Sequence, residues 1–248
     1  MASIIQHVEV KILGISGTPV KGGNCDTYVQ ESLKVAAEIE GVKTEFVTLA
    51  GKKIEMCRHC QWCMKNRAPC NIKDDAQEVW DKILWSDGII FGAPTWVNTL
   101  SPPLMMLWSR ARYHAFFTRN LLNKVAGYLT IGFFGWGLEH ALDTMENMSK
   151  IFMIPVARGW ALASRAAFGE RPAYLEHGVL DDKVGMLRAR NVALRVVEVS
   201  RLIKYATESG IQLPEEYRPT FTGSRLKKAE QKVMVNGVWR EKKQSYKV

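Results

Sequence analysis

The chain has 248 residues, 47% of them hydrophobic, so it is long and apolar enough to bury the core of a sizeable domain. Its apolar runs stay below the roughly 18 residues that a membrane helix needs, and residues 1–10 lack a basic-then-apolar signal, so we expect a cytoplasmic protein without membrane contact. The net charge of +9 would attract a nucleic acid, an anionic nucleotide or an acidic electron carrier, but no recognition helix, zinc-finger spacing or RNA-binding aromatic box supports nucleic acid.

Strand and helix patterns alternate along residues 8–207. Strands are expected at 8–15, 43–49, 88–92, 124–131 and 151–156, and helices at 26–40, from a cap at Asp74 to Leu84, 102–117, 138–150 and 182–207. Residues 157–180 have the composition of a loop. Five strands joined by helices predict an α/β domain with a doubly wound parallel sheet of order 2-1-3-4-5, spanning residues 1–207.

Residues 208–248 are expected to form a C-terminal extension. This stretch carries nine Lys and Arg against five Glu, a local charge of +4. It is either a solvated tail or an arm that grips a second subunit.

Four of the five cysteines, Cys57, Cys60, Cys63 and Cys70, fall within fourteen positions with the spacing C-x2-C-x2-C-x6-C. Thiolates this close together can converge on one [4Fe–4S] cluster. A zinc site is the main alternative, although zinc sites usually come as two separated pairs of cysteines. A disulfide pair is disfavoured in a protein that we expect to be cytoplasmic.

The first predicted strand is followed by a loop of small residues and then by a helix start. Ser16, Thr18 and Asn24 add hydrogen-bonding side chains to the backbone N–H groups and positive helix end of this loop. The sequence is neither a Walker A loop nor GxGxxG, so a monophosphate ester such as FMN fits better than a dinucleotide. Cys25 is either a thiol made acidic by the helix end or a small residue beside the phosphate.

Two further loops follow the third and fourth strands. They carry Trp96, Phe133 and Trp136 to the carboxyl edge of the predicted sheet, where a flat aromatic ligand would bind. The alternative is that these aromatic residues cover the core or a dimer contact. We expect the cofactor-binding residues to be Ser16, Thr18, Pro19, Gly23, Asn24, Cys25, Pro94, Thr95, Trp96, Val97, Asn98, Gly132, Phe133 and Gly135.

These features resemble the iron–sulfur flavoproteins of archaea and anaerobic bacteria, which belong to the flavodoxin-like, NADPH-dependent FMN reductase group. The resemblance spans residues 8–205, and the cysteine spacing is its most specific part. It implies a flavodoxin-like fold, FMN and a [4Fe–4S] cluster, and a homodimer or homotetramer that brings the cluster of one subunit near the flavin of another. Cys25 in place of a hydroxyl residue, Trp96 in place of a tyrosine, and the basic extension depart from the family pattern.

The leading hypothesis is an oxidoreductase that passes electrons between a [4Fe–4S] cluster and FMN. Ferredoxin or NAD(P)H would be the donor and a small molecule the acceptor. Two alternatives are a non-catalytic redox or oxygen sensor and an NAD(P)H-dependent FMN reductase with structural zinc. The sequence singles out no catalytic acid or base.

Overall fold

The computed structural model describes residues 8–118, 120–163, 177–211, 232–235 and 238–241. The strands are β1 (Val10–Ser16), β2 (Val42–Thr48), β3 (Gly88–Trp96), β4 (Thr99–Leu100), β5 (Val125–Gly132), β6 (Ile154–Leu162), β7 (Lys232–Val235) and β8 (Val238–Glu241). The helices are α2 (Asn24–Ala37), α3 (Trp62–Asn66), α4 (Ala76–Trp85), α5 (Pro102–Ser109), α6 (Arg112–Phe117), α7 (Leu138–Ser149), the 3-10 helix η1 (Gly178–Asp181) and α8 (Lys183–Glu208).

Five parallel strands form the main sheet in the order β2-β1-β3-β5-β6. Ile12 of β1 pairs with Thr44 of β2 and with Gly88 of β3, and Gly88 pairs in turn with Val125 of β5. Because β4 is only a short antiparallel partner of β3, this is the predicted 2-1-3-4-5 order, and the predicted flavodoxin-like fold class is confirmed.

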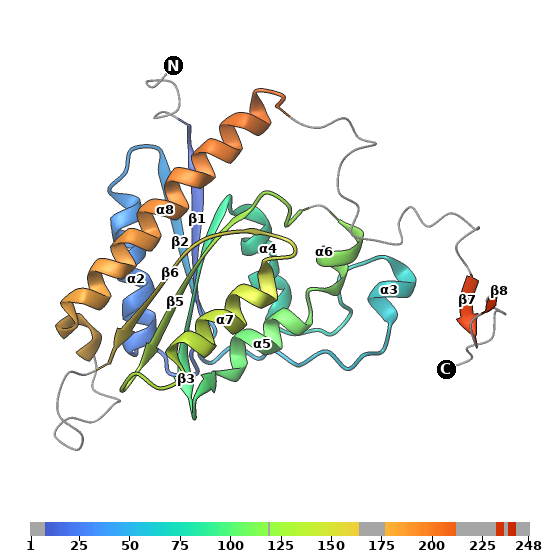
Figure 1. Ribbon diagram of the computed structural model, residues 1–248, viewed down its shortest axis with the longest axis horizontal. Helices are drawn as coiled ribbons and strands as arrows, with labels where there is room; N and C mark the ends of the chain where they lie inside the picture. The colour runs from blue at the N-terminus through green and yellow to red at the C-terminus, as the bar shows by residue number, and fades with distance from the viewer. Residues whose placement is uncertain (1–7, 119, 164–176, 212–231, 236–237, 242–248) are drawn as a thin grey trace.

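Helices cover both faces of the sheet (Figure 1). Val10 and Ile12 of β1 pack in the core beneath α2 and α8, whereas Leu13 and Ile15 pack in the core beneath α4, α5 and α7. Successive side chains of a strand point to opposite faces, so a strand between two helical layers is apolar throughout. The run of buried residues in β1 therefore follows from its central place in the sheet.

The structure differs from the sequence prediction in three places. Strand β3 continues past Gly92 to Trp96 and turns back into β4, so the loop predicted after the third strand is partly a hairpin. The helix expected over 102–117 is two helices, because Arg110 ends α5 and its side chain turns into the interior. Residues 157–162, expected in a loop, continue β6 because they pair with β5. The half-buried pattern of these residues is typical of an edge strand.

The predicted extension falls mostly outside the described residues. Within it, β7 and β8 pair as an antiparallel hairpin, and the prediction that it grips a second subunit stays a prediction. No helix in the described ranges is both long enough and apolar enough to cross a membrane.

Candidate functional site

A cavity of about 310 Å³ opens at the carboxyl edge of the main sheet. The loop after β1, the end of β3 and the loop after β5 converge there, with the end of β6 closing one side. The cavity is lined by Thr18, Val20, Gly23, Asn24, Cys25, Pro94, Thr95, Trp96, Ile131, Gly132, Phe133 and Ala163. In a sheet of this order, β1 and β3 carry their connections to opposite faces, and the crevice between their ends is where ligands bind.

Most of the predicted cofactor residues line this cavity, and some do not. The predicted residues outside its lining are Ser16, Pro19, Val97, Asn98 and Gly135. Sequence reasoning missed Val20, Ile131 and Ala163. Ile131 was detectable as the last apolar residue of a predicted strand, but Ala163 was not, because its strand was expected to end at Val156.

The loop after β1 is held in shape by its own polar groups. Asp26 accepts hydrogen bonds from the Gly22 N–H at 2.8 Å and from the Thr48 hydroxyl at 2.9 Å. Gly22 has a φ of +69°, a left-handed conformation that suits glycine. Gly23, Asn24 and Cys25 are the N-cap and first two residues of α2 and line the cavity, so the positive end of this helix lies at the cavity wall.

Asn24 and His177 connect this loop to the chain after β6. The Asn24 side-chain oxygen accepts a hydrogen bond from the Val179 N–H at 2.8 Å, and the Thr27 hydroxyl lies 3.0 Å from Nδ1 of His177. These contacts fix the orientation of Asn24 at the cavity wall.

Cys25 is a buried thiol in the cavity wall. Burial raises its pKa to about 12, although a 3.3 Å hydrogen bond from the Ser16 hydroxyl to its sulfur acts the other way. The interpretation of Cys25 as an acidified, reactive thiol is therefore wrong, because desolvation outweighs the hydrogen bond from Ser16 and the charge of Asp26 raises the pKa further. Its place beside Gly23 and Asn24 agrees with the alternative of a small residue at a phosphate site.

Two aromatic side chains line the cavity, Trp96 at the end of β3 and Phe133 after β5. Trp96 is 46% exposed, so its ring has a face open to a ligand. Trp136 packs edge-on against Phe134, with the ring centroids 4.8 Å apart, and does not line the cavity.

The two rim loops touch through their backbones. A Cβ atom on Gly137, which has a φ of +73°, would come within 2.7 Å of the Asn98 backbone. Val97 and Asn98 form the β3–β4 turn with φ values of 44° and 63°. Because Val97 is fully exposed and β-branched, its left-handed backbone is strained.

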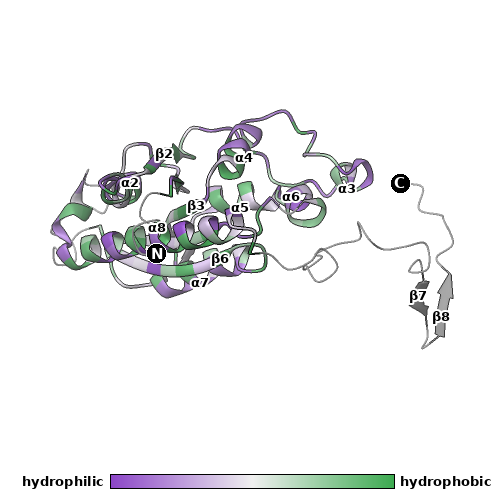
Figure 2. Cartoon of the chain, turned by 90° about the horizontal axis from the view of Figure 1, so that it is seen from above, coloured by the Kyte–Doolittle hydropathy of each residue, from purple (hydrophilic) through white to green (hydrophobic). Residues whose placement is uncertain are grey.

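The cysteine segment, residues 57–70, lies away from this cavity and contributes no lining residue. It contains the short helix α3, which Figures 1 and 2 both place at the opposite end of the molecule from α2. All five cysteines are free thiols. In the described part of the chain, no three His, Cys, Asp or Glu side chains are grouped closely enough to hold a metal ion, so the predicted cluster stays a prediction.

The pKa of Cys63 nevertheless depends on two of the other three cysteines. Burial raises the pKa of Cys63, and the charges of Cys70 and Cys57 raise it further, whereas the neighbouring Arg112 lowers it. Cys63 is thus within electrostatic reach of Cys57 and Cys70, while Cys60 is exposed.

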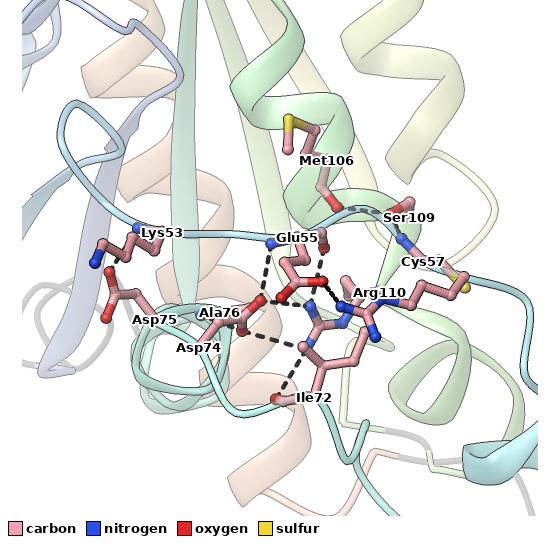
Figure 3. Close-up of polar contacts among 11 residues, drawn as sticks. Lys53, Glu55, Cys57, Ile72, Asp74, Asp75, Ala76, Met106, Ser109 and Arg110 are labelled. Carbon is pink, nitrogen blue, oxygen red and sulfur yellow. Dashed lines mark hydrogen bonds and ion pairs between the residues drawn. The ribbon is translucent and has the colours of Figure 1, made fainter.

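Arg110 joins the two ends of the cysteine segment (Figure 3). Its Nη1 donates to the Glu55 carbonyl at 2.9 Å and to Asp74 Oδ2 at 2.7 Å, and its Nη2 donates to the Ile72 carbonyl at 3.3 Å. Ser109 contributes a further tie, because its hydroxyl accepts from the Cys57 N–H at 3.0 Å. The Arg110–Asp74 ion pair is almost completely buried, with side chains 3% and 4% exposed.

A second cavity, of about 320 Å³, lies at the amino-terminal edge of the sheet. Burial lowers the pKa of Lys124 there to about 8, but its ammonium group donates to the carbonyl oxygens of Leu84 and Ser86. Lys204 is paired with Asp87 at 3.1 Å. These charged groups serve the packing of α4 and α8, so the carboxyl-edge cavity is the better candidate site.

The comparisons with known proteins agree with this geometry. Residues 10–167 match the family model of NADPH-dependent FMN reductases. The chain is 36% identical over 197 residues to an iron–sulfur flavoprotein of Methanocaldococcus jannaschii, which covers 79% of this chain and 100% of that protein. It is 29% identical over 196 residues to an iron–sulfur flavoprotein of Methanosarcina thermophila, with coverage of 79% and 97%.

Solved structures share the fold at low sequence identity. RosB with bound 8-demethyl-8-formylriboflavin-5'-phosphate matches with a TM-score of 0.63 at 17% identity, over 85% of this chain and 90% of that chain. A flavone reductase matches with a TM-score of 0.58 at 19% identity, over 79% and 65%. At these identities the likeness supports the fold alone.

Proposed function

Since this chain belongs to the NADPH-dependent FMN reductase family and is an FMN-dependent oxidoreductase, we propose that it passes electrons between FMN at the carboxyl-edge cavity and a [4Fe–4S] cluster. The cluster would be held by Cys57, Cys60, Cys63 and Cys70. The single observation that carries the proposal is the cavity itself, in which the N-terminus of α2 and an exposed indole face one space.

The cavity residues fit a flavin mononucleotide. The positive N-terminal end of α2 at Gly23 and Asn24 lies at the cavity wall and suits a phosphate, and Trp96 and Phe133 offer ring faces to an isoalloxazine. Ile131 and Ala163 would keep water from the inner side of the ring. Pro94, Thr95 and Gly132, which also line the cavity, allow close approach of the backbone to a flat ligand. Ser16, Pro19, Val97, Asn98 and Gly135 would support these contacts from outside the lining.

The cysteine segment fits an iron–sulfur cluster, and its C-x2-C-x2-C-x6-C spacing favours a cluster over a zinc ion, whose sites usually have two separated pairs of cysteines. Four soft thiol donors lie in one short segment, and three of them are electrostatic neighbours. Two arginines beside them have buried N–H groups without a partner among the described residues, on Nε of Arg110 and Nη1 of Arg112. Such donors suit the sulfur atoms of an anionic cluster.

When bound, FMN supplies two-electron chemistry and the cluster supplies one-electron transfer. The chain's own contribution is to bind and orient both groups and to set how easily each is reduced. Within one chain the cavity and the cysteine segment share no residue. A homodimer or homotetramer would bring the cysteines of one subunit to the cavity of another, as the family resemblance implies. Ferredoxin or NAD(P)H would be the donor and a small molecule the acceptor.

The test is the cofactor content of protein purified without oxygen. We expect bound FMN, about four irons per chain, and loss of the iron but not of the FMN when Cys60 and Cys63 are changed to serine. Cys25→Ser is the matched control, because this fifth cysteine lies at the cavity and should leave the iron content unchanged. Zinc in place of iron would instead identify a reductase with a structural metal, and would contradict the proposal.

A further inference from the structure

We propose that Arg110 and Arg112 act as a pair of cationic supports for the iron–sulfur cluster: Arg110 fixes the base of the cysteine segment, and Arg112 raises the reduction potential of the cluster. This inference rests on the proposed function, because the cluster is part of that proposal. The two arginines lie on either side of the junction between α5 and α6.

The cysteine segment has little structure of its own. Helix α3 has five residues, none of them buried, and is flanked by Gln61 and Arg67 in left-handed conformations. His59 has a φ of 53°, also left-handed. A segment without a buried apolar face depends on contacts from outside to hold one conformation.

Arg110 supplies those contacts. Its guanidinium bonds to Glu55, two residues before the first cysteine, and to Ile72, two residues after the last. Asp74 completes the junction, since it pairs with Arg110 and accepts a hydrogen bond from the Glu55 N–H at 2.8 Å. The planar fork of an arginine makes all of these bonds at once, which a lysine cannot do.

Arg112 has a different relation to the cysteines. Its Nη2 donates to the Gln61 side chain at 3.2 Å, its Nη1 is buried without a partner, and its charge acts directly on Cys63. The structure records no ion pair for Arg112 in the described ranges. Arg110 also interacts with a cysteine, Cys70, but Asp74 balances its charge. Arg112 therefore presents an uncompensated positive charge toward the thiols.

The sign of the effect follows from charge. A reduced cluster carries one more negative charge than an oxidised one, so a fixed cation and its N–H donors favour the reduced form and raise the potential. A guanidinium stays protonated at all working pH values, so this bias is constant. The low exposure of the unpartnered N–H group limits screening by water.

The experiment compares four variants of the anaerobically purified holoprotein. Arg112→Gln removes the charge, Arg112→Lys keeps it, Arg110→Lys keeps the charge but loses the fork, and Arg195→Gln is the control. Arg195 is an exposed arginine on α8, which packs on the other core of the sheet. The readouts are iron per chain, FMN per chain, and the midpoint potential of the cluster in a dye-mediated titration followed by electron paramagnetic resonance.

We expect Arg112→Gln to keep its iron and FMN and to titrate at a more negative potential than the wild type, with Arg112→Lys close to the wild type. Arg110→Lys should bind at least twofold less iron while retaining FMN. Wild-type potentials in Arg112→Gln together with full iron in Arg110→Lys would overturn the inference. Failure of the proposed function is distinguishable, because in that case the wild-type protein itself would lack iron.

Discussion

At the scale of single residues, Asp74 accepts hydrogen bonds from Arg110 and from the Glu55 and Ala76 N–H groups beside the cysteine segment. Burial acts to raise the pKa of this carboxyl, but hydrogen bonds from Arg110 and from the Glu55 and Ala76 N–H groups outweigh it, so the pKa is lowered overall. Asp74 was expected only as a helix cap. Asp74 does accept a hydrogen bond from the Ala76 N–H at 3.1 Å, as a cap would, and it also forms the ion pair with Arg110.

We predict that Asp74→Asn destabilises the folded chain by about 3–5 kcal/mol, because it leaves the Arg110 charge buried without a partner. The stabilisation from Asp74 is present above the pKa of an unfolded aspartate, about 3.9, and is lost as the pH falls through the lower folded value. Urea unfolding at neutral pH and at pH 3 measures both effects. Glu78→Gln is the control, because Glu78 forms an exposed pair with Lys52 and should change the stability little. Equal losses in the two variants would refute the prediction.

Cys25 gives a second prediction at this scale. Because burial raises its pKa to about 12, the thiol stays protonated in the folded protein at pH 8 and should resist alkylation. We expect mass spectrometry of metal-free protein treated with iodoacetamide to find Cys60, which is exposed, labelled well before Cys25. Unfolding in urea should remove the difference. Equal labelling of the two thiols in the folded protein would contradict the structure.

At the scale of elements, close contact between α2 and the sheet depends on glycines in the strands. A Cβ atom added to Gly92 of β3 would lie 2.2 Å from Cγ2 of Val29, and its next contacts are ordinary ones. Val29 is fully buried on α2. A methyl group added at Gly92 would therefore force α2 or the Val29 side chain to move away from β3.

We predict that Gly92→Ala lowers the free energy of unfolding by about 1–3 kcal/mol through this clash. Adding Val29→Ala should relieve it, so the double variant should be more stable than the sum of the two single losses predicts. Chemical denaturation of the four proteins forms the cycle. Additive losses would show that the clash is not the cause.

The element pattern was the part of the fold most accessible from the sequence. The buried run of β1 and the apolar face of α4 were recognisable from periodicity alone, and so was the strand order from the alternation. The continuation of β6 from Ala157 to Leu162 was not, because these residues lack a strand periodicity and become a strand only by pairing with β5.

Parts of the candidate site were likewise predictable from the sequence, and other parts were not. Gly23 and Asn24 were predictable because they fall between a strand and a helix start, a local pattern. Arg110 and Arg112 were not, since the sequence places them 40 or more residues after the cysteines and only folding brings them there. The convergence of four sulfur atoms was expected from their spacing, but the structure brings no three of them into ligating range in the described residues.

At the scale of the whole molecule, α8 is the last described element that contributes to the two cores, and it packs against α2 and the sheet. We predict that a chain ending at residue 211 keeps its FMN content and thermal midpoint, because every described element of the two cores lies before that point. If residues 212–248 hold subunits together, sedimentation will show a smaller assembly. A loss of FMN or of folded structure would contradict the proposed division of the chain.

The central claim is that each subunit holds a one-electron centre at its cysteines in addition to a two-electron flavin at its cavity. Anaerobic titration of the purified protein with dithionite counts these electrons directly, with the flavin and the cluster followed by visible absorption. The account predicts that complete reduction consumes one electron per chain more than the bound flavin requires, and that the excess disappears in the Cys60→Ser and Cys63→Ser double variant. A wild-type protein that consumes only the electrons of its flavin would contradict it.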